Sequence, residues 1–182
     1  MVTAKIIGGK ALMKKFQKMG DVMGEEFKGV VVDTAHYANA QAVNHINKNV
    51  KQGTGHLRQS MYVTDLKETG PFTFHVEVGN RAEYAGYVEF GTGKRVSVPP
   101  EFSGIAADVR SQPVDKGEVV IQKIKDWCKR LGIDVDAAYP IFVSILRTGI
   151  KPRPFMYPAY KMAQRYMKKE SEKALKRIVN TK

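Results

Sequence analysis

The side chains that most often do chemistry in proteins are few in this sequence, and they lie far apart. The histidines form no His-Glu-x-x-His pair and the single cysteine has no Cys-x-x-Cys partner, so the spacing predicts no metal site. The cysteine lies on an apolar helical pattern, which is typical of a core residue rather than a nucleophile. These residues are His36, His45, His56, His75 and Cys128.

The serines and glycines give no sign of an enzyme either. No serine stands in the Gly-x-Ser-x-Gly context of a nucleophile elbow. The segment 91–94 (Gly-Thr-Gly-Lys) lacks the spacing of a phosphate loop, and Arg95 stands where a Ser or Thr would be required. We therefore expect a tight turn there, no cofactor and no catalytic activity.

Length and composition describe the chain that carries these residues. It has 182 residues, of which 43% are hydrophobic and 26% charged, values that exclude wholesale disorder. One cysteine excludes an intramolecular disulfide framework. No apolar run approaches the ~18 residues of a membrane span, and the N-terminus lacks a signal-peptide pattern. We expect one soluble, cytosolic domain over residues 1–182 that does not act at a membrane.

Net charge suggests the kind of partner. The formal charge is +12, and residues 161–182 hold eight basic but only two acidic residues. Such a field favours a polyanion, which can be nucleic acid, an acidic protein surface or an anionic membrane, although a solvated helix face has the same composition. The candidate contacts with DNA or an acidic partner are Lys168, Lys169, Lys173, Lys176 and Arg177.

Helical periodicity dominates both ends of the chain. Apolar residues at steps of three and four predict helices over 10–28 and 30–50, with a break near Gly29. The second pattern carries an alanine-rich stripe over 35–50, which would let another backbone approach closely. The same periodicity predicts a C-terminal helix over about 155–179.

The middle of the chain changes period. Alternating residues over 72–78 predict a half-buried strand, which can pair with 60–67 as a hairpin. A short helix is expected over 82–90, and a third strand over 95–98. The predicted fold class is α+β, with a small antiparallel sheet packed against the long N-terminal helix and the C-terminal helix.

An insertion over about 99–150 follows the sheet. Its first part, 99–117, contains Pro, Gly and Ser and has weak patterning, which predicts a long mobile loop that orders only against a neighbour. Two amphipathic helices follow, at about 118–131 and 136–147. They resemble a helix-turn-helix superficially, but the second helix offers few side chains that read bases. A nucleic-acid-binding module using 118–149 or 161–182 is the alternative function.

Three segments, in this order, carry the most specific information. They are Gly53-Thr-Gly-His-Leu-Arg-Gln-Ser60, Ala82-Glu-Tyr-Ala-Gly-Tyr-Val-Glu-Phe-Gly-Thr92 and Lys151-Pro-Arg-Pro-Phe-Met-Tyr-Pro-Ala159. Together they resemble the head–tail connection proteins of long-tailed phages, also called neck or tail-completion proteins. That minor structural family is typified by the tenth gene product of a lambdoid phage. The chain departs from the family pattern at Gly86, where Pro is frequent, and in its longer 93–150 region.

The resemblance implies which residues serve assembly, and each also has a physical interpretation. The spacing of Tyr84, Tyr87 and Phe90 puts three aromatic rings on one helical face, which can pack on the sheet or on a neighbouring subunit. Arg153 is held between prolines and suits a carboxylate such as Glu89 or one on another chain. The alternative is that the motifs only close the monomer's own core. The motif residues are Thr54, Gly55, Leu57, Arg58, Ser60, Tyr84, Tyr87, Glu89, Phe90, Gly91, Thr92, Arg153, Pro154 and Phe155.

The function implied by the resemblance is structural. The chain is expected in the virion of a phage or prophage, assembled in the bacterial host cytoplasm, at the junction of head and tail. Copies would form a homo-oligomeric ring, most simply a hexamer because tails of this type are six-fold, and packaged DNA would pass through it. The expected partners are other copies, neighbouring head-closure and tail proteins, and DNA bound without sequence preference. Closing such a ring needs two different patches per subunit, for which the aromatic face and the alanine-rich stripe are candidates.

Overall fold

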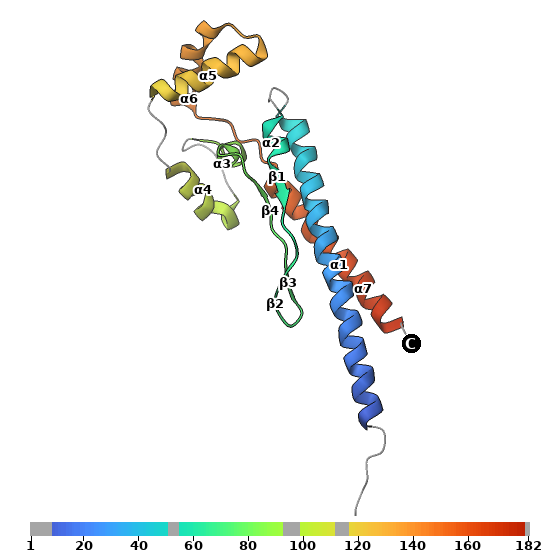
Figure 1. The fold of residues 1–182 in the computed structure, drawn as a ribbon. Helices are drawn as coiled ribbons and strands as arrows, with labels where there is room; N and C mark the ends of the chain where they lie inside the picture. Colours follow the sequence, from blue (N-terminus) through green and yellow to red (C-terminus); the bar gives the residue numbers. More distant parts are fainter. Residues whose placement is uncertain (1–8, 51–54, 93–98, 112–116, 181–182) are drawn as a thin grey trace, which may run out of the picture. The chain divides into compact units, whose positions relative to one another are not determined.

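A computed structural model describes residues 9–50, 55–92, 99–111 and 117–180 (Figure 1). The described residues are mostly helical, with four short strands between the first long helix and the later helices, which confirms the α+β class. The elements are α1 (Gly9–Asn49), α2 (His56–Gln59), β1 (Met61–Val63), β2 (Lys67–Gly70), β3 (Thr73–His75), β4 (Val78–Asn80), α3 (Ala85–Phe90), η1 (Pro100–Phe102), α4 (Ser103–Ser111), α5 (Gly117–Leu131), η2 (Val135–Ala137), α6 (Ala138–Thr148) and α7 (Met156–Asn180).

The chain divides into two compact units, each built from separate stretches of sequence. The first unit contains Met1–Asn39, Val63–Val78 and Tyr160–Lys182, and the second contains Ala40–Tyr62 and Gly79–Ala159. Both long helices and the hairpin therefore contribute residues to each unit. The expectation of a single domain over 1–182 stays a prediction.

Helix α1 runs without interruption through Gly29, so the predicted break there is wrong. A glycine inside a helix costs about 1 kcal/mol relative to alanine, which packing on either side can offset. Gly29 itself is exposed and no side chain crowds it, while Val30 and Ala35 just beyond it are buried.

The strands form one long hairpin with an irregular middle. β1 pairs with β4, and β2 pairs antiparallel with β3 in the register Lys67↔His75 and Glu68↔Phe74. The predicted hairpin is confirmed, but its strands reach beyond the predicted 60–67 and 72–78, since β2 ends at Gly70 and β4 at Asn80. The turn lies at Pro71–Phe72, and residues 76–77 are not in a strand. The third strand predicted over 95–98 lies outside the described residues.

The segment predicted as a long loop is largely helical. Residues Pro100–Phe102 form a 3-10 turn that continues directly into α4. Its apolar residues are few but well placed, since Ala106 is 1% exposed and the Phe102 ring lies 6.4 Å from that of Phe90. The loop prediction for 99–111 is therefore wrong, because tertiary packing stabilises a weakly patterned helix. The predicted mobility stays untested, and residues 112–116 lie outside the described residues.

Helices α5 and α6 confirm the predicted helical insertion. The Asp134 carboxylate accepts a hydrogen bond from the Asp136 amide at 3.0 Å, which caps the turn η2 before α6. Pro140 lies in the first turn of α6, where its missing N–H is tolerated. Cys128 and Ala138 are fully buried, so the cysteine is a core residue as expected.

Within the first unit, α7 packs along α1. The Tyr37 and Tyr166 rings stack with centroids 4.3 Å apart, and the Arg177 guanidinium contacts the Glu26 carboxylate at 2.7 Å. The predicted C-terminal helix is confirmed, and its residues Ala163, Ala174 and Ile178 are buried. Among the described helices, none is long and apolar enough to cross a membrane.

Candidate functional site

The three motif segments come together in the second unit. Leu57 from the first motif and Phe155 from the third are 4% and 1% exposed, and both belong to one core cluster. The second motif contributes Ala82 to the same cluster. The remaining buried members come from α1 and the start of α7, namely Ala42, Ile46 and Ala159.

Glu89 is the buried charged residue that joins the second and third motifs. Its side chain is 7% exposed, and its carboxylate faces the first turn of α7. Oε2 accepts hydrogen bonds from the amides of Phe155 at 2.7 Å and Met156 at 2.9 Å, and Oε1 accepts one from Tyr157 at 2.9 Å. A carboxylate at a helix N-terminus satisfies orphan donors and complements the helix dipole. Glu89 therefore caps α7 from a distant part of the sequence.

This arrangement corrects the partner suggested for Arg153. Both Glu89 oxygens accept backbone amides, whereas the Arg153 side chain is exposed. Arg153 contributes to the same junction through its backbone, whose N–H donates to the Val88 carbonyl at 2.7 Å. The pairing of its exposed guanidinium with a carboxylate on another chain stays a prediction.

The end of the second motif is tied to the segment that precedes α7. The Thr92 amide donates to the Ile150 carbonyl at 3.0 Å, and the Ile150 amide donates to the Thr92 hydroxyl at 2.7 Å. Gly91 and Gly149 adopt positive φ angles of 66° and 73° in this contact, and a Cβ on Gly149 would overlap the Thr92 carbonyl. Two glycines are needed because the two backbones lie against each other.

The first motif turns the chain from α1 towards the sheet. Gly55 has φ 79° and precedes the short helix α2, as the motif's Thr-Gly step predicts. The Asn80 amide group donates to the Leu57 carbonyl at 2.6 Å, and the Arg81 amide donates to the Ser60 carbonyl at 2.9 Å. The motif thus joins β4 to α2. Arg58 is exposed, and Thr54 lies outside the described residues.

The aromatic rings at the two ends of the aromatic face, those of Tyr84 and Phe90, both contact other residues of the same chain. Phe90 packs against Phe102, whose ring makes an edge contact with Tyr157 at 5.4 Å. The Tyr84 hydroxyl lies 3.4 Å from the His56 Nδ1, and partial burial raises the pKa of Tyr84. Tyr84 keeps 42% of its surface exposed, and Tyr87 is half-buried. This geometry supports the alternative in which the motifs close the monomer's own core.

The basic residues of α7 remain at the surface of the first unit. Two of the five are paired, Lys173 with Glu170 at 2.7 Å and Arg177 with Glu26. In the described part of the chain, no acidic residue forms an ion pair with Lys168, Lys169 or Lys176. These three ammonium groups can donate hydrogen bonds to phosphate or to the carboxylates of an acidic partner.

Two observations concern the residues that could bind a metal or act in catalysis. Within the described ranges no group of three His, Cys, Asp or Glu could hold a metal ion. Ser60 and His56 lie 3.5 Å apart, but both belong to the exposed turn around α2. What this cluster does is hold segments together.

Two contacts in the motif cluster could not be read from the sequence. Phe102 lies in the segment that we expected to be a loop, and Glu101 accepts a hydrogen bond from the Tyr157 hydroxyl at 3.5 Å. The local signal that could have revealed them is Pro99-Pro100 before a Glu and a Phe, a pattern that starts helices.

Comparison with known proteins supports the resemblance drawn from the motifs. Residues 10–91 match a family model described as "Bacteriophage HK97-gp10, putative tail-component". The match includes the first motif and the second as far as Gly91, and it ends before the third. It confirms the family resemblance over those residues, and it supports a structural role in a phage particle. No curated protein and no solved structure matches the chain significantly.

Proposed function

We propose that this chain, related to HK97-gp10-like phage tail components over residues 10–91, is a connector between the head and the tail of a phage particle. In this proposal several copies form a ring through which packaged DNA passes, most simply a hexamer. The family match is the observation that carries the proposal. The third motif lies outside the matched segment, and its connection to the second through Glu89 supports treating all three as one unit.

The role of the motif cluster in this function is mechanical. It fixes the start of α7 and the end of α3 with charged and backbone hydrogen bonds around a small apolar core. Buried, charge-assisted hydrogen bonds are stronger than neutral ones and they define geometry closely. A connector needs such rigidity, because its neighbours must be held at fixed positions.

The exposed lysines of α7 suit the passage of DNA. Lys168, Lys169 and Lys176 would contact phosphates without reading bases. The same lysines are the observation that favours the alternative, a nucleic-acid-binding module. A connector would bind all sequences with similar, salt-dependent affinity, whereas a regulator would bind one site orders of magnitude more tightly.

Deletion of the gene from an inducible phage tests the proposed function. Because heads and tails of long-tailed phages are built separately before joining, we expect DNA-filled heads and free tails to accumulate, and joined particles to return when the chain is supplied in trans. Electron microscopy of negatively stained lysates counts the three classes. Joined particles at the normal frequency after deletion would contradict a connector, and an early failure of head assembly would point to another structural role.

A further inference from the structure

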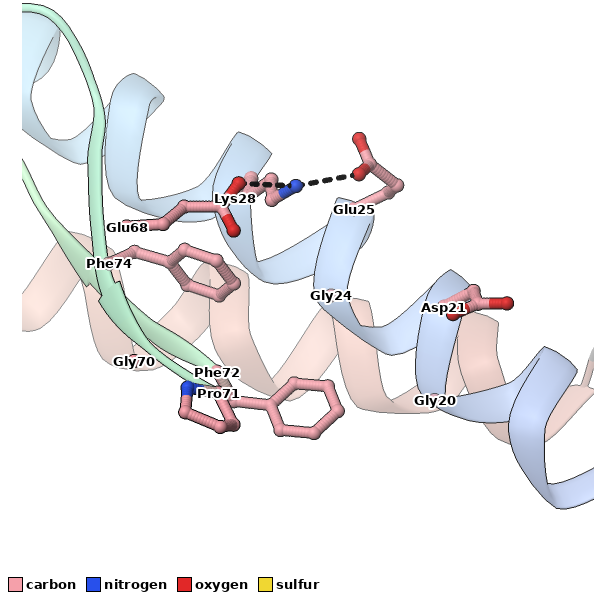
Figure 2. Close-up of a pocket in the computed structure, with 10 residues that line it drawn as sticks. All are labelled: Gly20, Asp21, Gly24, Glu25, Lys28, Glu68, Gly70, Pro71, Phe72 and Phe74. Atoms are coloured by element: carbon pink, nitrogen blue, oxygen red, sulfur yellow. Dashed lines mark hydrogen bonds and ion pairs between the residues drawn. The ribbon is translucent and has the colours of Figure 1, made fainter.

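The first unit contains a groove between α1 and the tip of the β2–β3 hairpin (Figure 2). Its volume is about 810 Å³, and it is lined by α1 on one side and by β2, β3 and their turn on the other. The apolar part is formed at the turn, where Phe72 and Pro71 lie opposite Gly20 and Gly24 of α1. A Cβ on either glycine would lie 3.8 Å from the Phe72 ring, so glycine leaves room beside the ring.

Phe72 is held in the groove in an unusual conformation. Its φ is 55°, the left-handed region that bulky residues rarely adopt, and its side chain is 56% exposed. Strained residues that persist in a fold are concentrated at functional positions. The exposed Phe72 ring is an apolar surface that the first unit does not cover.

The rim of the groove is acidic in a chain that is otherwise strongly basic. Three carboxylates, those of Asp21, Glu25 and Glu68, line it together with one ammonium group, that of Lys28. Lys28 lies 2.9 Å from Glu25 and 2.7 Å from Glu68, as the dashed lines in Figure 2 show. The rim thus keeps a net negative charge, which suits a basic and apolar segment.

Such a segment exists on the outer side of α7 in the same unit. Met167, Leu175 and Val179 are 43%, 47% and 75% exposed, and with Ser171 they occupy steps of four along the helix. Residues at this spacing form a ridge on a helix surface. The exposed lysines Lys168 and Lys176 flank the ridge.

The hairpin that forms the groove and the helix α7 that carries the ridge contact different residues of α1. The hairpin contacts α1 at Gly20, Gly24 and Lys28, whereas α7 contacts it at Glu26 and Tyr37. Figure 2 shows the hairpin in front of α1 and α7 behind it. A chain that carries two complementary surfaces on different sides can associate head to tail, which is the contact that closes a ring.

We propose that the groove of one copy receives the outer ridge of α7 from the next copy. In the ring, the ridge would cover Phe72, and Lys168 and Lys176 would face the acidic rim and leave the contact with DNA to Lys169. On a free copy all three lysines can bind phosphate. This inference rests on the proposed ring, and it replaces the two surfaces predicted from the sequence. The alanine-rich stripe is buried in its own chain at Ala35, Ala42 and Ile46, and Phe90 of the aromatic face packs internally against Phe102.

Cross-linking between two differently tagged copies tests the contact. One copy carries Asp21→Cys at the rim and the other carries Val179→Cys on the ridge, so a link between the two tags is intermolecular. The native Cys128 is fully buried and leaves only the introduced thiols to react with a short bis-maleimide. We expect a heterodimer at high protein concentration, reduced at least five-fold by adding Leu175→Glu to the ridge copy.

A matched control uses another exposed leucine. Leu146 on α6 is 67% exposed and belongs to the second unit, so Leu146→Glu should leave the cross-link unchanged. Circular dichroism checks that both leucine variants fold. Absence of the heterodimer, or equal loss with Leu146→Glu, would overturn the proposed contact.

Particle assembly separates this inference from the proposed function. If the gene is needed to join heads and tails but Leu175→Glu joins them normally, the connector stands and this contact is wrong. If deletion leaves joined particles intact, the connector role fails whatever the cross-linking result.

Discussion

Glu89 is the residue on which the motif cluster depends most. One carboxylate accepts three backbone amides and so couples α3 to the first turn of α7. The sequence marked this residue as a motif member and suggested a basic partner for it. It could not show that the partner would be a helix N-terminus, because backbone donors have no sequence signature.

Replacing Glu89 by Gln should destabilise the second unit by about 2–3 kcal/mol, since the substitution removes the charge and turns one acceptor into a donor facing amide N–H groups. Urea denaturation followed by circular dichroism measures the change. Glu83→Gln, at an exposed position of the same segment, is the control and should alter stability by less than ~0.5 kcal/mol. Equal effects of the two variants would rule out the capping role.

Lys28 should make the first unit sensitive to alkaline pH. Hydrogen bonds from its ammonium group to Glu68 and Glu25 raise the pKa of Lys28 from 10.5 to about 12. A pKa raised by folding means that the stabilisation is complete below pH 10.5 and is lost as the pH rises through about 12. Urea midpoints measured up to that pH should fall more steeply for the wild type than for Lys28→Met. Lys48→Met, at an exposed position, should follow the wild type; parallel curves for all three proteins would contradict the prediction.

At the scale of elements, a strong repeat of apolar residues was sufficient to predict a helix or strand, and a weak repeat was not. Helices α5, α6 and α7 and the hairpin were predictable, because each has a clear apolar repeat and a recognisable start or stop residue. Helix α4 was not, because it is short and its order depends on contacts such as Phe102 with Phe90. The sequence also failed to predict that α1 continues through Gly29. The reason is related, because the burial of the residues on either side decides whether a glycine ends a helix.

Gly149 lies where the end of α6 meets the segment that follows α3, and this position should tolerate no side chain. It ends α6 with φ 73° and ψ 176°, a region almost confined to glycine, and a Cβ there would overlap the Thr92 carbonyl. We expect Gly149→Ala to lower stability by more than ~3 kcal/mol. Gly132→Ala is a matched comparison, because Gly132 also has a positive φ, of 66°, but has open space around its Cβ position. It should cost only about 1–2 kcal/mol, and similar losses for both variants would refute the close approach.

At the scale of the whole molecule, the sequence predicted some of the surfaces available to a partner and missed others. The motif residues predicted as assembly contacts are divided, because Leu57, Glu89, Gly91 and Phe155 are buried in the second unit whereas Arg58, Tyr84, Arg153 and Pro154 are exposed. The basic residues of α7 are exposed as predicted. The groove beside Phe72 was not predictable, because it depends on where the hairpin tip meets α1. Composition can indicate a polyanionic partner, but only the fold shows which charges are already paired.

Any DNA binding should be electrostatic and carried by α7. Replacing Lys168, Lys169, Lys173, Lys176 and Arg177 by Gln should reduce the slope of log affinity against log salt by about three, because each phosphate contact contributes ~0.9 and two of the five are already paired. Fluorescence anisotropy with duplex DNA measures the slope. An unchanged slope would mean that α7 is a partner surface or a solvated face. Loss of binding in Lys125→Gln/Lys129→Gln instead would favour the alternative module at 118–149.

The central claim is that the chain is a ring-forming part of the head–tail junction. Electron cryomicroscopy of purified particles, with a small tag on the C-terminus of the chain, tests it most directly. We expect density for the chain in a closed ring, most simply six-fold, between the head and the tail tube, with the tag repeated once per subunit. Tag density elsewhere in the particle, particles without the chain, or a two-fold dimer in place of a ring would contradict the account.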